Sequence, residues 1–216
     1  MRTIIFSRMS DRIQDTNTID EDEALAAVGE LYYRGIGIEK DFEQAFRYYR
    51  KAADMGNASA LRRLASCYEQ GLGTTPDMEA ALLCYEDASE KGDALATLRL
   101  GDYYRNGLNP LITKDMLKAT DYYLAALQQA KYNMDVWGAP DIYLRVGDCL
   151  LNGIGIQKDV EAAYNFYSAA ANLYLERIDS GDGESEALLE EADQGMEKCN
   201  ELLGYVEEIS PEGFEA

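Results

Sequence analysis

Two residue patterns in this 216-residue chain could do chemistry, and the first is a pair of glycines before a helical segment. Backbone amides beside Gly35 and Gly37 could bind a phosphate at the start of a helix. The surrounding residues do not form a Walker sequence, no strand pattern precedes them, and the same turn returns at 71/73 and 153/155. The glycine pairs are therefore interpreted as structural turns.

The second pattern is the acidic stretch "DSGDGESEALLEE", which begins at Asp179. A calcium-binding EF-hand loop does not fit it, because Gly181 stands where a ligand is needed and Glu184 where the loop needs glycine. Ser185 lacks the second glycine of a nucleophile elbow. Since the chain has no histidine, it also lacks the commonest general base near neutral pH and the usual ligand of transition metals. We therefore predict no catalytic residue, no cofactor and no metal site.

Composition narrows the possible partners and compartment. The formal net charge of -20 disfavours binding to nucleic acid or to an anionic membrane, because such binding depends on lysine and arginine. No apolar run is long enough for a membrane helix or for a signal peptide, so a cytoplasmic location is expected. The cysteines form no C-x-x-C pair and are expected to be reduced, mostly buried thiols: Cys67, Cys84, Cys149 and Cys199.

A repeated unit organises most of the chain. Four glycines recur at intervals of 36, 36 and 46 residues: Gly35, Gly71, Gly107 and Gly153. Six residues before each of them lies a small residue: Gly29, Ala65, Gly101 and Gly147. After each glycine come an aspartate, an alanine four residues later and a tyrosine eight residues later, which is Tyr49, Tyr85, Tyr123 or Tyr167.

Offsets of four and eight place the alanine and the tyrosine on one face of a helix that the aspartate caps. Each unit is therefore a helical hairpin, and hairpins of this size must stack on one another to bury their apolar faces. The sequence predicts an all-α fold.

The string "AVGELYYRGIGIEKDFEQAFRYYRKAADMGN" and its three further copies resemble the Sel1-like repeat, a relative of the tetratricopeptide repeat. The resemblance covers roughly residues 22 to 176, and it implies a right-handed α-solenoid of four helical hairpins that acts as an adaptor for other proteins. The predicted repeats span 22–57, 58–93, 94–139 and 140–176.

The remaining segments are expected to play minor structural roles. Residues 1–19 are expected to be a poorly ordered N-terminal extension. A linker at 177–183 leads to a capping helix at 184–210, and residues 211–216 form a tail. The third repeat carries an insertion with Trp137, which either packs over a neighbouring hairpin or anchors a ligand.

Polar residues recur on one face of the first helix of each hairpin, and this face is predicted to line the groove of the solenoid. Its residues are Arg34, Arg63, Gln70, Arg99, Asp102, Asn106, Arg145, Asp148 and Asn152. Three arginines in one column could bind the carboxylates or carbonyls of an extended peptide. They could instead pair locally, Arg99 with Asp102 and Arg145 with Asp148.

The sequence thus favours a non-catalytic scaffold that binds a peptide or a partner protein in this groove. The alternative is a carboxylate-dependent hydrolase of a small or cell-wall substrate. A concave pocket with two carboxylates out of contact with any arginine would favour the hydrolase. The identity of the partner and the oligomeric state are not predicted.

Overall fold

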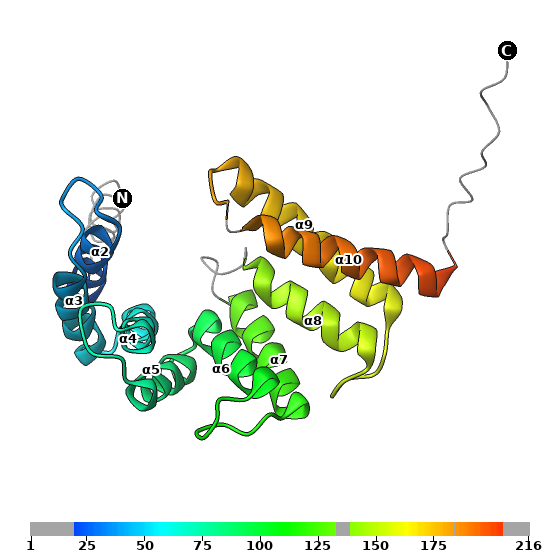
Figure 1. The fold of residues 1–216 in the computed structure, drawn as a ribbon, viewed down its shortest axis with the longest axis horizontal. Helices are drawn as coiled ribbons and strands as arrows, with labels where there is room; N and C mark the ends of the chain where they lie inside the picture. Colours follow the sequence, from blue (N-terminus) through cyan, green and yellow to red (C-terminus); the bar gives the residue numbers. More distant parts are fainter. Residues whose placement is uncertain (1–19, 133–138, 184, 205–216) are drawn as a thin grey trace, which may run out of the picture. The chain divides into compact units, whose positions relative to one another are not determined.

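The computed structural model describes residues 20–132, 139–183 and 185–204, and within these ranges the regular elements are the helices α2 to α10 (Figure 1). The fold is the predicted all-α solenoid of helical hairpins. The chain divides into two compact units, one ending at Lys91 and the other beginning at Gly92. Each unit is described separately below.

Unit 1 contains the first two hairpins. The first is α2 (Glu21–Arg34) followed by α3 (Phe42–Asp54), and the second is α4 (Ala58–Gln70) followed by α5 (Met78–Glu90). Each of these helices packs against its neighbour in the sequence, including α4 against α3 of the preceding hairpin.

Unit 2 contains two further hairpins and the capping helix. They are α6 (Ala94–Asn106) with α7 (Met116–Tyr132), α8 (Pro140–Asn152) with α9 (Val160–Asp179), and finally α10 (Ser185–Leu203). Helix α7 has 17 residues against 13 in α3, because the beginning of the predicted insertion continues the helix. Helix α9 likewise runs into the predicted linker and ends at Asp179. The predicted N-terminal extension, Trp137 and the tail lie outside the described residues.

Local capping explains where the second helices begin. The predicted aspartate caps accept a backbone hydrogen bond from the third residue that follows: Asp41 from Gln44 N at 3.0 Å, Asp77 from Ala80 N at 3.0 Å and Asp159 from Ala162 N at 2.9 Å. The preceding first helices end at glycines with positive φ, such as Gly35 at 72°. That conformation strains other residues and so fixes glycine in the turn.

The core of each hairpin is built from the predicted alanine and tyrosine columns. These side chains are buried: Ala45, Tyr49, Ala81, Tyr85, Ala119, Tyr123, Ala163 and Tyr167. A Cβ atom added to Gly29 would lie 2.7 Å from the Tyr49 ring, and one added to Gly101 would lie 2.6 Å from the Tyr123 ring. In these two hairpins the glycine of the first helix therefore leaves the space that the tyrosine ring occupies.

Helix α10, which lies in the segment predicted to be a capping helix, packs on α9. Tyr167 lies between Gly147 of α8 and Gly195 of α10, where added Cβ atoms would come within 2.9 and 2.7 Å of its ring. The other buried residues of α10, Ser185, Ala192 and Cys199, share the stripe of Gly195. One face of α10 is therefore buried against its neighbours.

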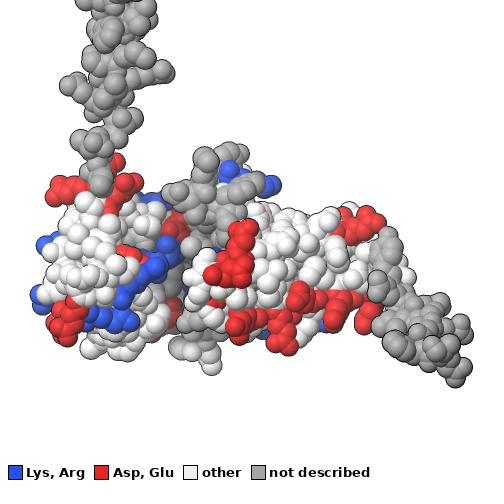
Figure 2. All heavy atoms as spheres, turned by 90° about the horizontal axis from the view of Figure 1, so that it is seen from above, with Lys and Arg blue, Asp and Glu red and all other residues white. Residues whose placement is uncertain are grey.

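Charges are unevenly distributed on the surface. On the face drawn in Figure 2, lysine and arginine side chains gather in one region, and acidic side chains form separate clusters elsewhere. Within the described residues, no helix is both long enough and apolar enough to cross a membrane.

Candidate functional site

In unit 1 the predicted first-helix face is organised around Glu30 of α2. Its carboxylate accepts a hydrogen bond from the Tyr49 hydroxyl at 2.7 Å and meets Arg63 Nη2 of α4 at 3.2 Å. Arg34 also pairs with it from one turn away. Burial alone would raise the pKa of Glu30, but the Tyr49 hydrogen bond and the two arginines together lower it. Arg63 is therefore engaged with the preceding hairpin.

The rest of this face in unit 1 is exposed. Gln70 lies at the end of α4 and donates to the Ser66 hydroxyl at 2.9 Å. Arg34 is exposed beyond its contact with Glu30. Both predicted groove residues remain accessible to a partner.

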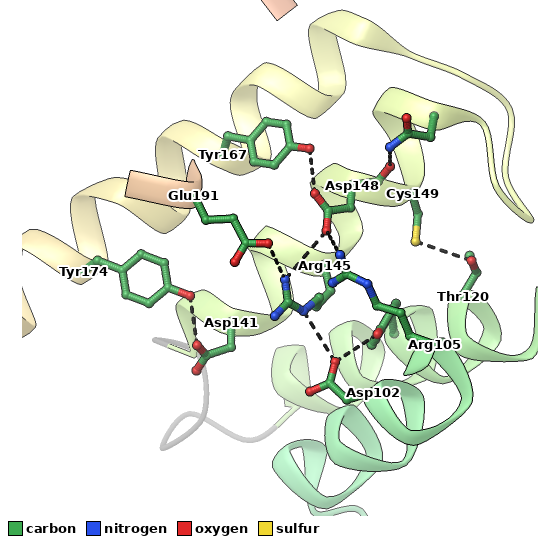
Figure 3. Close-up of polar contacts among 12 residues, drawn as sticks. Asp102, Arg105, Thr120, Asp141, Arg145, Asp148, Cys149, Tyr167, Tyr174 and Glu191 are labelled. Atoms are coloured by element: carbon green, nitrogen blue, oxygen red, sulfur yellow. Dashed lines mark hydrogen bonds and ion pairs between the residues drawn. The ribbon is translucent and has the colours of Figure 1, made fainter. Parts of the chain in front are cut away.

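In unit 2 the corresponding centre is Arg145 of α8, which meets carboxylates from three helices (Figure 3). Its guanidinium lies 3.4 Å from Asp102 of α6, 3.7 Å from Asp148 of its own helix and 2.9 Å from Glu191 of α10. The predicted local pair with Asp148 is present. Arg145 also connects its own helix α8 to α6 through Asp102 and to α10 through Glu191. Burial alone would lower the pKa of Arg145, and these carboxylates raise it.

Asp102 and Asp148 each receive a tyrosine hydroxyl from the second helix of their own hairpin. Tyr123 donates to Asp102 and Tyr167 donates to Asp148, both at 2.9 Å (Figure 3). Burial raises the pKa of Asp148, and it outweighs the opposing effects of Arg105, whose Nη2 lies 3.2 Å away, and of Tyr167 and Arg145. The same order of groups occurs in unit 1 as Tyr49, Glu30 and Arg63.

The other predicted groove residues of unit 2 lie on α6 and α8. Arg99 is placed with its guanidinium over the Tyr103 ring, 5.1 Å from the centroid. Asn106 is exposed at the end of α6, beside the turn that follows. Asn152 is exposed at the end of α8 and donates to the Asp148 carbonyl at 2.8 Å.

A pocket of about 290 Å³ opens beside this network in unit 2. Its polar lining comes from α6, α8 and α10: Arg105, Asp148, Asn152, Glu191, Gln194 and Lys198. Met116, Leu151 and Ile154 supply apolar walls. The structure thus brings Asp148 and Asn152 together, and it places the predicted residue Arg145 beside them through its contacts with Asp148 and Glu191.

Sequence reasoning missed the residues that complete this arrangement. Arg105, Glu191 and Lys198 were not among the predicted groove residues, because the last two lie in the cap and Arg105 has no counterpart of the same type in other repeats. The tyrosine and carboxylate columns were both visible, but their pairing across about 20 residues was not. The pairs join positions 19 residues apart in the first and fourth repeats and 21 apart in the third, whose turn is two residues longer, and this recurring spacing is the signal that could have revealed the pairing.

The four cysteines are free thiols, and Cys67, Cys149 and Cys199 are buried. Burial raises the pKa of Cys67 to about 11, so its reactive thiolate form is suppressed near neutral pH. Among the described residues, no group of three or more histidine, cysteine, aspartate or glutamate side chains could hold a metal ion.

Comparison with known proteins identifies the repeat. The Sel1 repeat family model matches residues 22–57, 58–93, 94–130 and 141–174. A Sel1 repeat protein of Oxalobacter formigenes has a similar crystal structure, with a TM-score of 0.56 and 24% identity over 93% of this chain and 81% of that one. A protective antigen of uropathogenic Escherichia coli, displaying an SLR fold, matches at a TM-score of 0.47 and 22% identity, covering 84% of this chain and 46% of the antigen.

None of the curated proteins matches this sequence. The Sel1 repeat fold is typical of protein–protein interaction scaffolds. Because the family model covers all four hairpins, which make up well over half of the sequence, this chain belongs to the Sel1 repeat family.

Proposed function

We propose that this protein is a non-catalytic scaffold that binds a peptide or a partner protein on the first-helix face. The observation that carries the proposal is the pocket of unit 2, where polar groups from three helices face open space. Adjacent polar groups that converge on a concavity are the usual means by which a protein fixes the orientation of a ligand.

The groups available in the pocket include both donors and acceptors of hydrogen bonds. Among the residues that the structure describes, Lys198 forms no ion pair, and Asn152 uses its amide nitrogen to donate to the Asp148 carbonyl. Glu191 contacts Arg145 through one carboxylate oxygen, which leaves the other for a ligand. An extended peptide presents N–H and C=O groups in alternation, and this mixed lining is suited to both.

The sequence left two roles open for the arginine column, peptide binding and local pairing, and we propose a structural role for two of its members. Arg63 and Arg145 already meet carboxylates of neighbouring helices, so they position the face. Direct contacts with the partner are assigned to the exposed residues Asn152 and Lys198 in unit 2, together with Asn106, and to Arg34 and Gln70 in unit 1.

Hydrolysis is not proposed, because the two carboxylates that line the pocket both contact arginine. Asp148 lies 3.2 Å from Arg105, and Glu191 lies 2.9 Å from Arg145. A general acid and a nucleophile of a hydrolase need carboxylates whose charge is free to change during the reaction.

The test begins with selection of binding peptides from a displayed random library by the full chain. Affinities of the selected peptides are then measured by fluorescence anisotropy for the wild type and for a Lys198→Glu/Asn152→Ala variant. We expect the double variant to bind at least about tenfold more weakly, a loss of about 1.4 kcal/mol. Lys131→Glu, an exposed lysine at the end of α7 that does not line the pocket, is the matched control and should bind like the wild type. Equal affinity of all three proteins, or no selected peptide, would contradict the proposed site.

A further inference from the structure

Helix α3 of unit 1 lines a second groove, which lies outside the first-helix face. The groove has a volume of about 530 Å³ and follows the exposed side of α3, with Gly73 of the turn after α4 at its edge. A Cβ atom added to Gly73 would overlap the Phe42 carbonyl, so this turn lies directly against the start of α3. The turn therefore forms a wall of the groove.

Three cations occupy the middle of the groove, namely Arg47, Arg50 and Lys51, and all three are exposed. Arg47 lies 4.0 Å from Glu43, and both side chains are more than half exposed, so this pair contributes little. Within the described part of the chain, Arg50 and Lys51 form no ion pair. The positive charge of these side chains is therefore available to an anionic partner.

Aromatic rings hold two of these cations in place without neutralising them. Arg50 lies over the Phe46 ring, 5.9 Å from its centroid, and Lys51 lies over the Tyr48 ring at 5.5 Å. Tyr48 in turn stacks on Tyr32 of α2, with 5.6 Å between the ring centroids. A cation–π contact orients the cation and leaves its charge for a carboxylate. The groove is thus partly organised before a partner arrives.

Packing of the solenoid does not require these cations. They lie six, nine and ten residues after the capping aspartate Asp41. Neutral or acidic residues take the same three positions in the other second helices: Leu83, Glu86 and Asp87 in α5, Asp121, Leu124 and Ala125 in α7, and Asn165, Ser168 and Ala169 in α9. The cations of α3 are therefore a local feature, in a chain with 40 acidic residues against 20 lysines and arginines.

We propose that this groove binds an acidic segment of a partner protein, in an extended conformation and with acidic side chains at alternate positions. Arg47 and Lys51 are four residues apart, which is about 6 Å along a helix axis. Alternate side chains of an extended peptide lie on one side and repeat every 6.5–7 Å or so, so that successive acids can each meet one cation. Arg50, between them in the sequence, can bind a carboxylate through two parallel hydrogen bonds.

Charge favours a short acidic segment over a nucleic acid or an anionic membrane. The net charge of -20 repels an extended polyanion beyond the groove, whereas a short segment contacts only the groove itself. Glu43 and Asp54 lie in the first turn and at the last residue of α3. These two acids bound the cationic stretch and restrict it to the middle of the helix.

The experiment uses the full chain and a short fluorescein-labelled peptide in which glutamate alternates with alanine, with binding measured by fluorescence anisotropy. We expect Arg47→Glu/Lys51→Glu to raise Kd at least about tenfold, and the charge-keeping variant Arg47→Lys/Lys51→Arg to stay within about threefold of the wild type. Lys131→Glu/Lys158→Glu is the matched control, because it makes the same change in net charge at exposed residues outside the groove, and it should bind like the wild type. A peptide with glutamine in place of glutamate should not bind.

Equal affinities of the wild type and Arg47→Glu/Lys51→Glu would overturn the proposal. Equal weakening by the control variant would also overturn it, because net charge and not the groove would then determine binding. Binding of phosphatidylserine vesicles or single-stranded DNA through Arg47 and Lys51, without binding of the acidic peptide, would refute the assigned class of partner. Self-association that Arg47→Glu/Lys51→Glu abolishes would refute it in favour of a second copy of the chain.

The groove of α3 and the pocket of unit 2 are tested independently. Lys198→Glu/Asn152→Ala, which alters the pocket of unit 2, should leave the Kd of the acidic peptide unchanged. A rise in that Kd would place the acidic peptide in unit 2 and refute its assignment to α3.

Discussion

Replacement of Arg145 by methionine is the most informative perturbation of unit 2. The change keeps most of the aliphatic stem and removes only the guanidinium, which contacts Asp102, Asp148 and Glu191. The side chain of Glu191 is 40% exposed, so its pair with Arg145 contributes at most about 1 kcal/mol. Asp102 and Asp148 are more buried, and without Arg145 their charges would be less compensated.

Loss of one partner from a buried ion pair costs about 3–5 kcal/mol. Here the cost is smaller, because Tyr123 and Tyr167 still donate to the two aspartates and Arg105 still lies beside Asp148. We therefore expect Arg145→Met to destabilise unit 2 by about 2–3 kcal/mol.

The assay is urea unfolding followed by circular dichroism, with hydrogen exchange at the α8 amides to assign the loss to unit 2. Lys131→Met serves as the control for removal of an exposed cation, and it should change stability by less than about 0.5 kcal/mol. In an Asp102→Asn background the effect of Arg145→Met should shrink, because one of its charged partners is already absent. A loss below about 0.5 kcal/mol for Arg145→Met would refute the view that this arginine compensates buried carboxylates.

Three further predictions concern unit 1. Tyr49→Phe removes the hydrogen bond to Glu30 and should lower the free energy of unfolding by about 0.5–1.5 kcal/mol in urea titrations. Gly29→Ala forces a methyl group against the Tyr49 ring and should cost about 1–3 kcal/mol, whereas Gly183→Ala, which has open space around it, should cost little by the same measurement. The lowered pKa of Glu30 means that its contribution to stability is present above the ordinary carboxyl value of 4.5 and is lost as the pH falls through its folded value. The stability difference between the wild type and Glu30→Gln should therefore shrink below pH 4.5; a difference that is constant from pH 7 to pH 3 would exclude this linkage.

The fold was predictable from sequence because the same pattern of capping, small and aromatic residues occurs in all four repeats. Asp41 and its counterparts were expected to cap the second helices, and the structure confirms this. The tyrosine column was expected to be buried, and Tyr49 is indeed packed against Gly29. Periodicity carries this information because helix caps and faces depend on spacings of three to eight residues.

The partners of the polar groups were less predictable, because they depend on distances between helices. The pair of Arg145 and Asp148 follows from a spacing of three residues, and it was foreseen as one of two alternatives. The contacts of Arg145 with Asp102 and Glu191 join residues 43 and 46 positions away, and they appear only when the helices are placed. Glu191 lies in a capping helix outside the repeat register, so no column of the repeat pointed to it.

The buried tyrosines explain why this acidic chain carries arginines in the same column of successive first helices. A buried tyrosine hydroxyl needs an acceptor, and Glu30, Asp102 and Asp148 provide one to Tyr49, Tyr123 and Tyr167. A carboxylate in a partly buried position is costly unless a cation lies near it, and arginine supplies that charge together with directional hydrogen bonds.

The second hairpin tests this reasoning within the molecule. There the position of the acceptor is Ser66, and Tyr85 donates instead to Glu69, one helical turn further along at 3.0 Å. In this hairpin the tyrosine hydroxyl therefore donates to a carboxylate at a different position of the same helix. We infer that the acidic residues of this face serve mainly as acceptors for buried tyrosine hydroxyls and not as ligand-binding groups. Partner binding is then expected to depend on the polar residues at the ends of the first helices and in the cap, where Asn152 and Lys198 are not committed to the core.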